Sequence, residues 1–246
     1  MGARAAGLAY ASSCLADEWA IFNNVAGLAK VDKASSAYTY DTQPSFKPFD
    51  RMAAVVAVPL SFGTAGAGVF RFGDELYNEH MMTVGFSNTF GLASLGLKVN
   101  YIQYTAAGFG SKGLVSLSFG GIATLTEKIS IGAHIINLNQ PEISSENEKL
   151  PTLLIVGVGF QLAPGIFVTT ELEKDLNYPV KWKTGVAYQL YKKFTIRTGF
   201  NLNPATAFFG LGFRAKKFKL DYAYQHHFNI GSRHQATVGY IFKKQK

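Results

Sequence analysis

Opposite charges stand on two neighbouring stretches of the chain at a spacing of two residues. Glu171 and Glu173 precede a short predicted turn, and Lys181 and Lys183 follow it. Side chains two residues apart point to the same side of a β-strand, so pairing of the two stretches would bring these carboxylates against these ammonium groups. Such a group could orient a polar solute in a channel. It could also form a closed ion-pair network, because unpaired buried charge is costly.

Other charged side chains alternate with apolar ones along the chain and are predicted to share the same inner face. They are Lys98, Arg197, Asp221, Arg71, His134, Arg214 and Lys219. No Ser-His-Asp or Cys-His pairing accompanies them, and catalysis needs placed nucleophiles, bases and oxyanion donors. The sequence therefore predicts no catalytic residue and a protein that is not an enzyme.

Residue types that bind metals or nucleotides occur without the required context. His226, His227 and His234 flank one predicted loop, but adjacent histidines on a strand point to opposite faces. The stretch 108–113 fits G-x-G-x-x-G, yet a strand follows it where a dinucleotide site needs a helix. The single cysteine, Cys14, excludes an internal disulfide and a thiolate zinc cluster. We therefore expect no cofactor and no metal ion.

The elements that must position these residues are β-strands. Apolar Phe218, Leu220 and Tyr222 alternate with Lys219 and Asp221, and period-two alternation of this kind predicts a strand with one apolar face. We predict about fourteen such strands. Their ranges are 35–41, 51–62, 66–73, 80–89, 93–104, 113–125, 129–138, 152–162, 166–174, 179–190, 194–202, 205–214, 218–227 and 234–242.

Composition indicates where these strands lie. The 246 residues are 48% hydrophobic and only 16% charged, against about 25% charged in typical soluble domains. The sequence contains no run of eighteen or more apolar residues, which is what a transmembrane helix needs. Only helices and closed barrels satisfy every backbone group in lipid, so a transmembrane antiparallel β-barrel is favoured over a large soluble sandwich. The residues predicted to face lipid include Trp182, Phe209, Leu211, Phe213, Tyr222 and Tyr224.

Connection lengths alternate along the chain. Those after even strands are short, whereas the longest ones, 41–50, 105–112, 139–151 and 228–233, all follow odd strands. Three other connections after odd strands, near 74–79, 175–178 and 203–204, are shorter. Bacterial outer-membrane barrels have an even number of strands, short periplasmic turns and longer outer loops. We therefore expect a bacterial cell outer membrane location with both termini in the periplasm, and membrane lipids as neighbours.

The net charge of +8 does not indicate nucleic-acid binding, because it is spread through strands and turns without a basic helix. The predicted inner turns are basic at Lys128, Lys192–Lys193 and Lys216–Lys217, as is the tail Lys243–Lys246. These lysines could simply be solvated near lipid headgroups. They could equally form a ring that docks an acidic periplasmic partner.

Residues 1–34 are the one long stretch without strand alternation. We expect a single domain, residues 1–246, in which 1–34 form an N-terminal plug or hatch and 35–246 the barrel. Repeated glycines on the inner face would leave room for this segment, since glycine in a strand often marks a close backbone approach. These glycines are Gly85, Gly96, Gly120, Gly132, Gly157, Gly159, Gly185, Gly199, Gly210, Gly212 and Gly239.

The opening also carries a family resemblance. It resembles the G-x-R-x-x-G … A-D-[DE] … N-P-A-G-L-A opening of bacterial outer-membrane barrels that include the fatty acid transporter FadL and the PorV and PorQ proteins of type IX secretion. Val25 stands where those proteins usually have proline. The matching residues are Gly2, Arg4, Gly7, Asp17, Glu18, Asn24, Ala26 and Gly27.

The resemblance implies two alternative functions. A PorV/PorQ-like protein would be a non-enzymatic accessory or partner-binding subunit of a secretion or envelope complex. It would serve protein transport in a Bacteroidota-type envelope and contact other outer-membrane or periplasmic proteins. A FadL-like protein would be a channel or carrier for a small hydrophobic ligand. The chain is short for the larger FadL hatch, which favours the first expectation.

Overall fold

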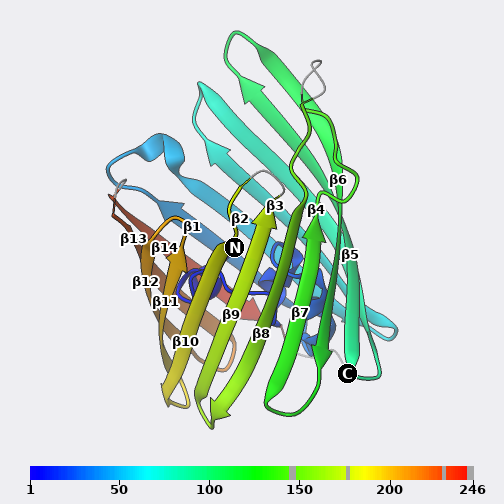
Figure 1. The fold of residues 1–246 in the computed structure, drawn as a ribbon, viewed down its shortest axis with the longest axis vertical. Helices are drawn as coiled ribbons and strands as arrows, with labels where there is room; N and C mark the ends of the chain where they lie inside the picture. Colours follow the sequence, from blue (N-terminus) through cyan, green and yellow to red (C-terminus); the bar gives the residue numbers. More distant parts are fainter. Residues whose placement is uncertain (144–147, 176–177, 229–230, 243–246) are drawn as a thin grey trace.

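The computed structural model, which describes residues 1–143, 148–175, 178–228 and 231–242, is a closed barrel of fourteen antiparallel strands (Figure 1). Each strand pairs with its neighbours in the sequence, and β1 closes the barrel against β14. The strands are β1 (Ser35–Thr42), β2 (Arg51–Leu60), β3 (Gly63–Gly73), β4 (Tyr77–Phe90), β5 (Ala93–Ala106), β6 (Gly110–Thr124), β7 (Ile129–Ile136), β8 (Leu153–Ala163), β9 (Ile166–Asp175), β10 (Lys181–Tyr191), β11 (Phe194–Leu202), β12 (Thr206–Arg214), β13 (Phe218–His227) and β14 (Gly231–Ile241).

The predicted fold class and strand number are confirmed. One predicted outer loop is wrong, because 105–112 is mostly strand: β5 pairs with β6 as far as Ala106 and Gly110. Its sequence alternates poorly, since both faces of the hairpin carry small or polar residues there. Backbone pairing nevertheless continues, because it does not depend on an apolar face.

The barrel wall is taller on one side. Strands β4, β5 and β6 have 14, 14 and 15 residues, whereas β11 and β12 have 9 each. At about 3.3 Å per residue, these strands span roughly 50 and 30 Å. Figure 1 shows the longer strands, cyan to green, extending well beyond the others at one end. This is the end of the odd-numbered connections, because the turn between β5 and β6 belongs to it.

The outer face is apolar, as predicted. Trp182, Phe209, Leu211 and Tyr222 are all exposed large side chains, and Leu211 is 46% accessible. Phe213 and Tyr224 lie on the same outward face of their strands and are partly covered. An outward apolar band over an alternating interior is the pattern of an outer-membrane barrel. No helix in the described part of the chain is long and apolar enough to cross a membrane.

The N-terminal segment, residues 1–34, lies inside the barrel and contains three short helices. They are α1 (Ala3–Ala6) and the 3-10 helices η1 (Glu18–Ile21) and η2 (Val25–Lys30); a fourth, η3 (Lys47–Phe49), lies between β1 and β2. Side chains of Asp17 and Asn24 cap η1 and η2 by accepting hydrogen bonds from backbone N–H groups. Helices this short are not stable alone, so packing inside the barrel holds them.

Inward glycines receive this segment. Ten of the eleven glycines predicted to face inward have an atom of residues 1–34 among their nearest neighbours, and the exception, Gly212, faces Arg197 and Asp221. A Cβ on Gly185 would lie 2.7 Å from the Leu8 carbonyl oxygen, and one on Gly7 would lie 3.0 Å from the Gly210 Cα. Any larger residue would push the segment away from the wall.

The predicted direction of Arg71 on β3 is wrong. Gly66 and Gly68 face Leu28 and Phe22 inside the barrel, which places Arg71 on the outer face, where it is exposed. Alternation divides a strand into two faces but does not say which is inside. On β3, Phe70 points inward and packs against the apolar part of the N-terminal segment.

Candidate functional site

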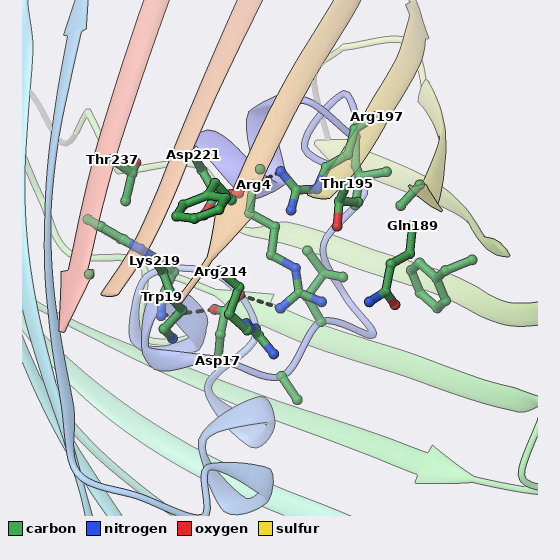
Figure 2. A pocket seen from close by; sticks show the side chains of 18 of the residues that line it. Arg4, Asp17, Trp19, Gln189, Thr195, Arg197, Arg214, Lys219, Asp221 and Thr237 are labelled. Atoms are coloured by element: carbon green, nitrogen blue, oxygen red, sulfur yellow. Dashed lines mark hydrogen bonds and ion pairs between the residues drawn. The ribbon is translucent and has the colours of Figure 1, made fainter. Parts of the chain in front are cut away.

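A cavity of about 450 Å³ lies inside the barrel between the N-terminal segment and strands β8 to β14 (Figure 2). The segment contributes Arg4, Leu8 and residues 14–19 to its lining. Turn residues Gly165, Lys192 and Lys193 also line it, so it opens at the end of the short turns. We call it the inner cavity.

Three ion pairs border the inner cavity. Within the segment, Arg4 Nη1 lies 2.9 Å from Asp17 Oδ2. Between segment and wall, Lys219 Nζ lies 2.5 Å from Glu18 Oε2. Within the wall, Arg197 Nη1 lies 2.6 Å from Asp221 Oδ1. In each of the three pairs the two charges neutralise each other. Figure 2 shows the labelled side chains around this space, which come from the N-terminal segment and from strands β10 to β14.

The opposite side of the inner cavity is apolar. Leu8 and Leu15 belong to a small cluster with Ala5, against which Phe167 and Ala187 pack. Cys14 is also part of the lining, and its thiol donates to the backbone oxygens of 130 and 157 at 3.5 and 3.6 Å. Burial raises the pKa of this thiol, which keeps it protonated and a poor nucleophile.

The charges of β9 and β10 form a closed group that anchors the segment. Glu171 accepts hydrogen bonds from the backbone N–H groups of Ser12 (2.9 Å) and Ser13 (2.8 Å) and from the Ser13 hydroxyl. Its other carboxylate oxygen lies 2.9 Å from Lys183 Nζ. Glu173 pairs with Lys183 at 2.6 Å and with Lys181 at 3.0 Å. Two carboxylates and two ammonium groups thus satisfy one another and leave no free charge to orient a solute.

Lys98 on β5 lies apart from that group and is a second anchor. Its ammonium donates to the backbone oxygens of Ile21 (2.9 Å) and Phe22 (3.1 Å), and it has no carboxylate partner among the residues that the structure describes. The predicted inward charges therefore divide between β5 and strands β9 to β13. They are not one continuous site.

The resemblance residues near η2 hold the segment together. The Asn24 side chain donates to the Ser13 carbonyl (2.8 Å) and to the Gly121 carbonyl (3.0 Å). The Ala26 carbonyl accepts from the Ser87 hydroxyl at 3.0 Å. A Cβ on Gly27 would lie 2.3 Å from a backbone oxygen of the segment, so only glycine fits there.

The remaining resemblance residues act at the start of the segment. Gly2 has a φ of +86°, a conformation that favours glycine, and lies against the Trp19 ring. Gly7 lies against Gly210 on β12. Arg4, Asp17 and Glu18 form the ion pairs at the inner cavity. The structure thus uses these residues to build and seat the segment.

In a row of polar side chains on the loop side of the segment, only His134 was predicted from the sequence to face inward. Each belongs to one of four consecutive strands, is buried and has a polar atom with no hydrogen-bond partner in the described structure: Thr83, Asn100, Ser118 and His134. Thr83 is directly opposite Asn100 in the β4–β5 register. The sequence signal that could have predicted this row is that these polar residues share the inward face of their strands with the glycines.

His226 on β13 and His234 on β14 face outward, whereas His227 lies on the opposite face of its strand. The Tyr222 hydroxyl lies 2.6 Å from His234 Nδ1, and the Ser232 hydroxyl lies 3.1 Å from His226 Nδ1. Within the described ranges, no group of three or more His, Cys, Asp or Glu side chains could hold a metal ion. His226 and His234 therefore belong to a hydrogen-bonded polar patch on the outer wall.

A second hollow, of about 690 Å³, lies on the outer face of β10 to β14 and β1, and we call it the outer hollow. Apolar side chains dominate its lining. Thr195, Gly212, Phe213, Asp221 and Thr237 contribute atoms to both hollows. The two hollows therefore lie back to back on the wall formed by β11 to β14.

A scan of protein-family models and a search of curated proteins find no match to this chain. Solved structures do match. A structure described as the CymD monoaromatic hydrocarbon channel has a TM-score of 0.76 at 12% identity, covering 100% of this chain and 98% of that one. The Pseudomonas putida toluene transporter TodX gives 0.75 at 12% identity, covering 98% of this chain and 96% of that one. The KdgM porin gives 0.50 at 11% identity, covering 85% and 99%.

At this level of identity the matches show the fold alone, which is that of outer-membrane channels and porins. None of these three structures is a type IX secretion protein. The PorV/PorQ expectation and the Bacteroidota source that it implied therefore find no support.

Proposed function

We propose that the protein is an outer-membrane channel or carrier for a small hydrophobic ligand, closed in this state by its N-terminal segment. The observation that carries the proposal is the pair of hollows on one wall. The outer hollow is apolar and faces the membrane, while the inner cavity opens at the short turns. Both volumes fall in the range of about 300–1,000 Å³ that is common for small-molecule sites. The shared fold with hydrocarbon channels supports this proposal.

The N-terminal segment interrupts the path through the barrel. On the loop side of the inner cavity, the Tyr10 ring packs edge-on against Phe208 with centroids 5.9 Å apart, and its hydroxyl lies 3.4 Å from Gln235 Oε1. Burial raises the pKa of Tyr10 to about 12, so it remains a neutral hydrogen-bonding group. Passage thus requires the segment to move. With the short turns in the periplasm, β14 ends on that side, and the inner cavity is the periplasmic side of the path.

A reversible lock on the segment tests this function. A Cβ on Gly157 would lie 3.3 Å from Ser13 Cβ, close to the roughly 3.5–4.5 Å of disulfide-bonded pairs, and 2.8 Å from the Thr170 carbonyl oxygen, so β8 and β9 must shift slightly to admit it. We would introduce Ser13→Cys and Gly157→Cys together with Cys14→Ala, and measure uptake of radiolabelled toluene by cells that lack their own hydrocarbon channels. Uptake is expected with the full chain and with the reduced variant, but not with the oxidised variant.

The same variant serves as its own control, since oxidation changes only the lock. Equal uptake in the oxidised and reduced states would show that the segment does not gate the path. Uptake by the full chain no faster than by cells without it would overturn the proposed function itself.

A second candidate, a subunit that binds protein partners, draws on the tall side of the barrel. The β5–β6 hairpin projects beyond the shorter strands and carries Phe109, which is 94% exposed at its tip. Purification from native membranes should then recover stoichiometric protein partners, and Phe109→Ser should release them. Recovery of a clean single chain would remove this candidate.

A further inference from the structure

Three cations line the inner cavity without a carboxylate partner in the described structure. Lys192 and Lys193 form the turn between β10 and β11, and Arg214 ends β12. The three other cations of the lining are already neutralised by Asp17, Glu18 and Asp221. Six cations therefore face three carboxylates, and the lining has three positive charges in excess.

The fold gathers these three cations at one corner. The Arg214 N–H donates to the Lys193 carbonyl at 2.8 Å, which joins the end of β12 to the β10–β11 turn. Thr195 and Gln189 line the same corner and offer neutral hydrogen-bonding groups. Figure 2 shows Arg214, Thr195 and Gln189 around the same space. Charge and hydrogen-bonding groups thus face one volume from three adjacent strands.

Gly212 makes room on the wall behind this corner. A Cβ at that position would lie 2.6 Å from Arg197 Nη2 and 2.7 Å from Asp221 Oδ1. The guanidinium of Arg197 therefore lies flat against the wall, held by its own carboxylate partner. The cavity beside it stays open, and its uncompensated charge comes only from the three cations at the corner.

We propose that this corner binds a multiply charged oxyanion, with phosphate groups as the chemical class. Arginine presents a planar fork of donors that matches phosphate oxygens, and lysines add compact positive charges. An excess of three charges suits an anion with more than one negative charge better than a single carboxylate. The phosphate can belong to a soluble phosphorylated compound entering from the turn side, or to a phospholipid headgroup at the membrane surface.

This inference shares the inner cavity with the proposed function but does not require transport. A protein that binds phosphate groups at this corner and takes up no toluene would keep the inference and lose the proposed function. The reverse result would keep the function and lose the inference. The two experiments therefore fail separately.

The test is calorimetric titration of the full-length protein, in micelles of an uncharged detergent, with inorganic pyrophosphate. Arg214→Gln and Lys193→Gln remove one cation each from the corner. Lys128→Gln is the matched control, because Lys128 lies in a short turn of the same end but does not line the cavity. We expect Arg214→Gln to weaken binding roughly tenfold to a hundredfold, and Lys128→Gln to leave it almost unchanged.

A second arm separates the two sources of phosphate. The same titration is repeated with mixed micelles that contain phosphatidylglycerol or, as the zwitterionic comparison, phosphatidylcholine. Binding of pyrophosphate that depends on Arg214 supports a soluble ligand. Binding of phosphatidylglycerol alone that depends on Arg214 supports a headgroup.

Two results would overturn the inference. One is the absence of binding by the parent chain in both arms. The other is an equal loss in Lys128→Gln and Arg214→Gln, which would show general attraction to a basic surface. Heat-dependent gel migration of each variant checks that the barrel is folded, and Lys193→Gln, at an exposed turn, gives an independent measure of the same corner.

Discussion

The two halves of the N-terminal segment are both held by polar and apolar contacts, but the larger apolar cluster holds the second half. Residues 2–17 lie along β8 to β14, where Glu171 binds the backbone of Ser12 and Ser13 and where the inner cavity remains open. Residues 18–34 lie against β1 to β6, with η2 contacting β3 to β6. There Trp19, Ile21 and Leu28 form an apolar cluster with small residues of β1 and β2.

The difference assigns separate roles to the two halves. The hydrogen bonds from Ser12 and Ser13 to the Glu171 carboxylate are worth about 1.5–3 kcal/mol each, but contacts with water can replace them when the segment moves. Withdrawing a buried leucine or isoleucine side chain costs about 1.5–3 kcal/mol for each residue. We therefore expect residues 2–17 to move first and residues 18–34 to remain as a fixed floor.

Deletion of parts of the N-terminal segment should distinguish its two halves most strongly. A chain beginning at Glu18 lacks only the first half, and one beginning at Asp32 lacks nearly all of the segment. All strand pairing lies outside the segment, so both barrels should still close. In planar bilayers we expect no steady conductance from the full chain, a small one from the first truncation and a larger one from the second.

A folded chain beginning at Glu18 that stays silent would show that the second half closes the barrel alone. Large steady openings from the full chain would show that the segment does not close it at all. Heat-dependent gel migration confirms in each case that the barrel is present.

Core truncation should separate the halves in stability. Leu28→Ala removes a fully buried side chain from the apolar cluster and should lower the free energy of unfolding by about 2–5 kcal/mol. Leu15→Ala, which enlarges a cavity that already exists, should cost less. Denaturant unfolding followed by tryptophan fluorescence measures both. Equal losses would mean that the two halves are packed alike.

Removal of the polar anchor should loosen only the first half. Glu171→Gln weakens the charge-assisted hydrogen bonds to Ser12 and Ser13 and should cost about 1–3 kcal/mol. We expect brief conductance events that the parent chain does not show. Glu173→Gln is the matched control, because Glu173 pairs with Lys181 and Lys183 and, in the part of the chain that the structure describes, makes no hydrogen bond or ion pair with the segment. Similar events in both variants would assign the effect to the charge network instead of the anchor.

The smallest expected effect has opposite signs at two inward-facing residues of β4, Thr83 and Ser87. Thr83→Val removes a buried hydroxyl that has no partner in the described structure and should raise stability by about 1 kcal/mol. Ser87→Ala removes a hydroxyl bonded to the Ala26 carbonyl and should lower stability by a similar amount. Thermal unfolding followed by circular dichroism measures both. A loss of stability in Thr83→Val would indicate that the row of polar residues is hydrated.

The barrel could be predicted from the sequence because each strand carries its own signal. Alternation such as Phe218-Lys219-Leu220 is local, and repeated fourteen times it fixes the architecture. Which face of β3 points into the barrel could not be predicted, because it depends on the contacts of Gly66 and Gly68 with a segment far away in the sequence. The ends of β5 and β6 depend on backbone pairing, which leaves little trace in side-chain pattern.

The site was harder to predict than the fold for a related reason. The charges of Glu171 and Lys183 could be placed on adjacent strands by register, and the structure pairs them. Their main contact with the segment, however, is to backbone N–H groups, which every residue has. The inner cavity is a space between packed elements, so the residue types in the sequence do not predict it.

The unequal height of the barrel wall makes the opening at the end of the odd-numbered connections asymmetric. From Gly96, which lies against the segment, β5 continues for ten residues to Ala106, whereas β11 ends only three residues beyond Gly199, at Leu202. The rim of the barrel is therefore high along β4 to β6 and low along β11 to β13. The low part of the rim belongs to the same strands, β11 to β13, that line the outer hollow, so a molecule approaching the barrel from that side meets the shortest wall.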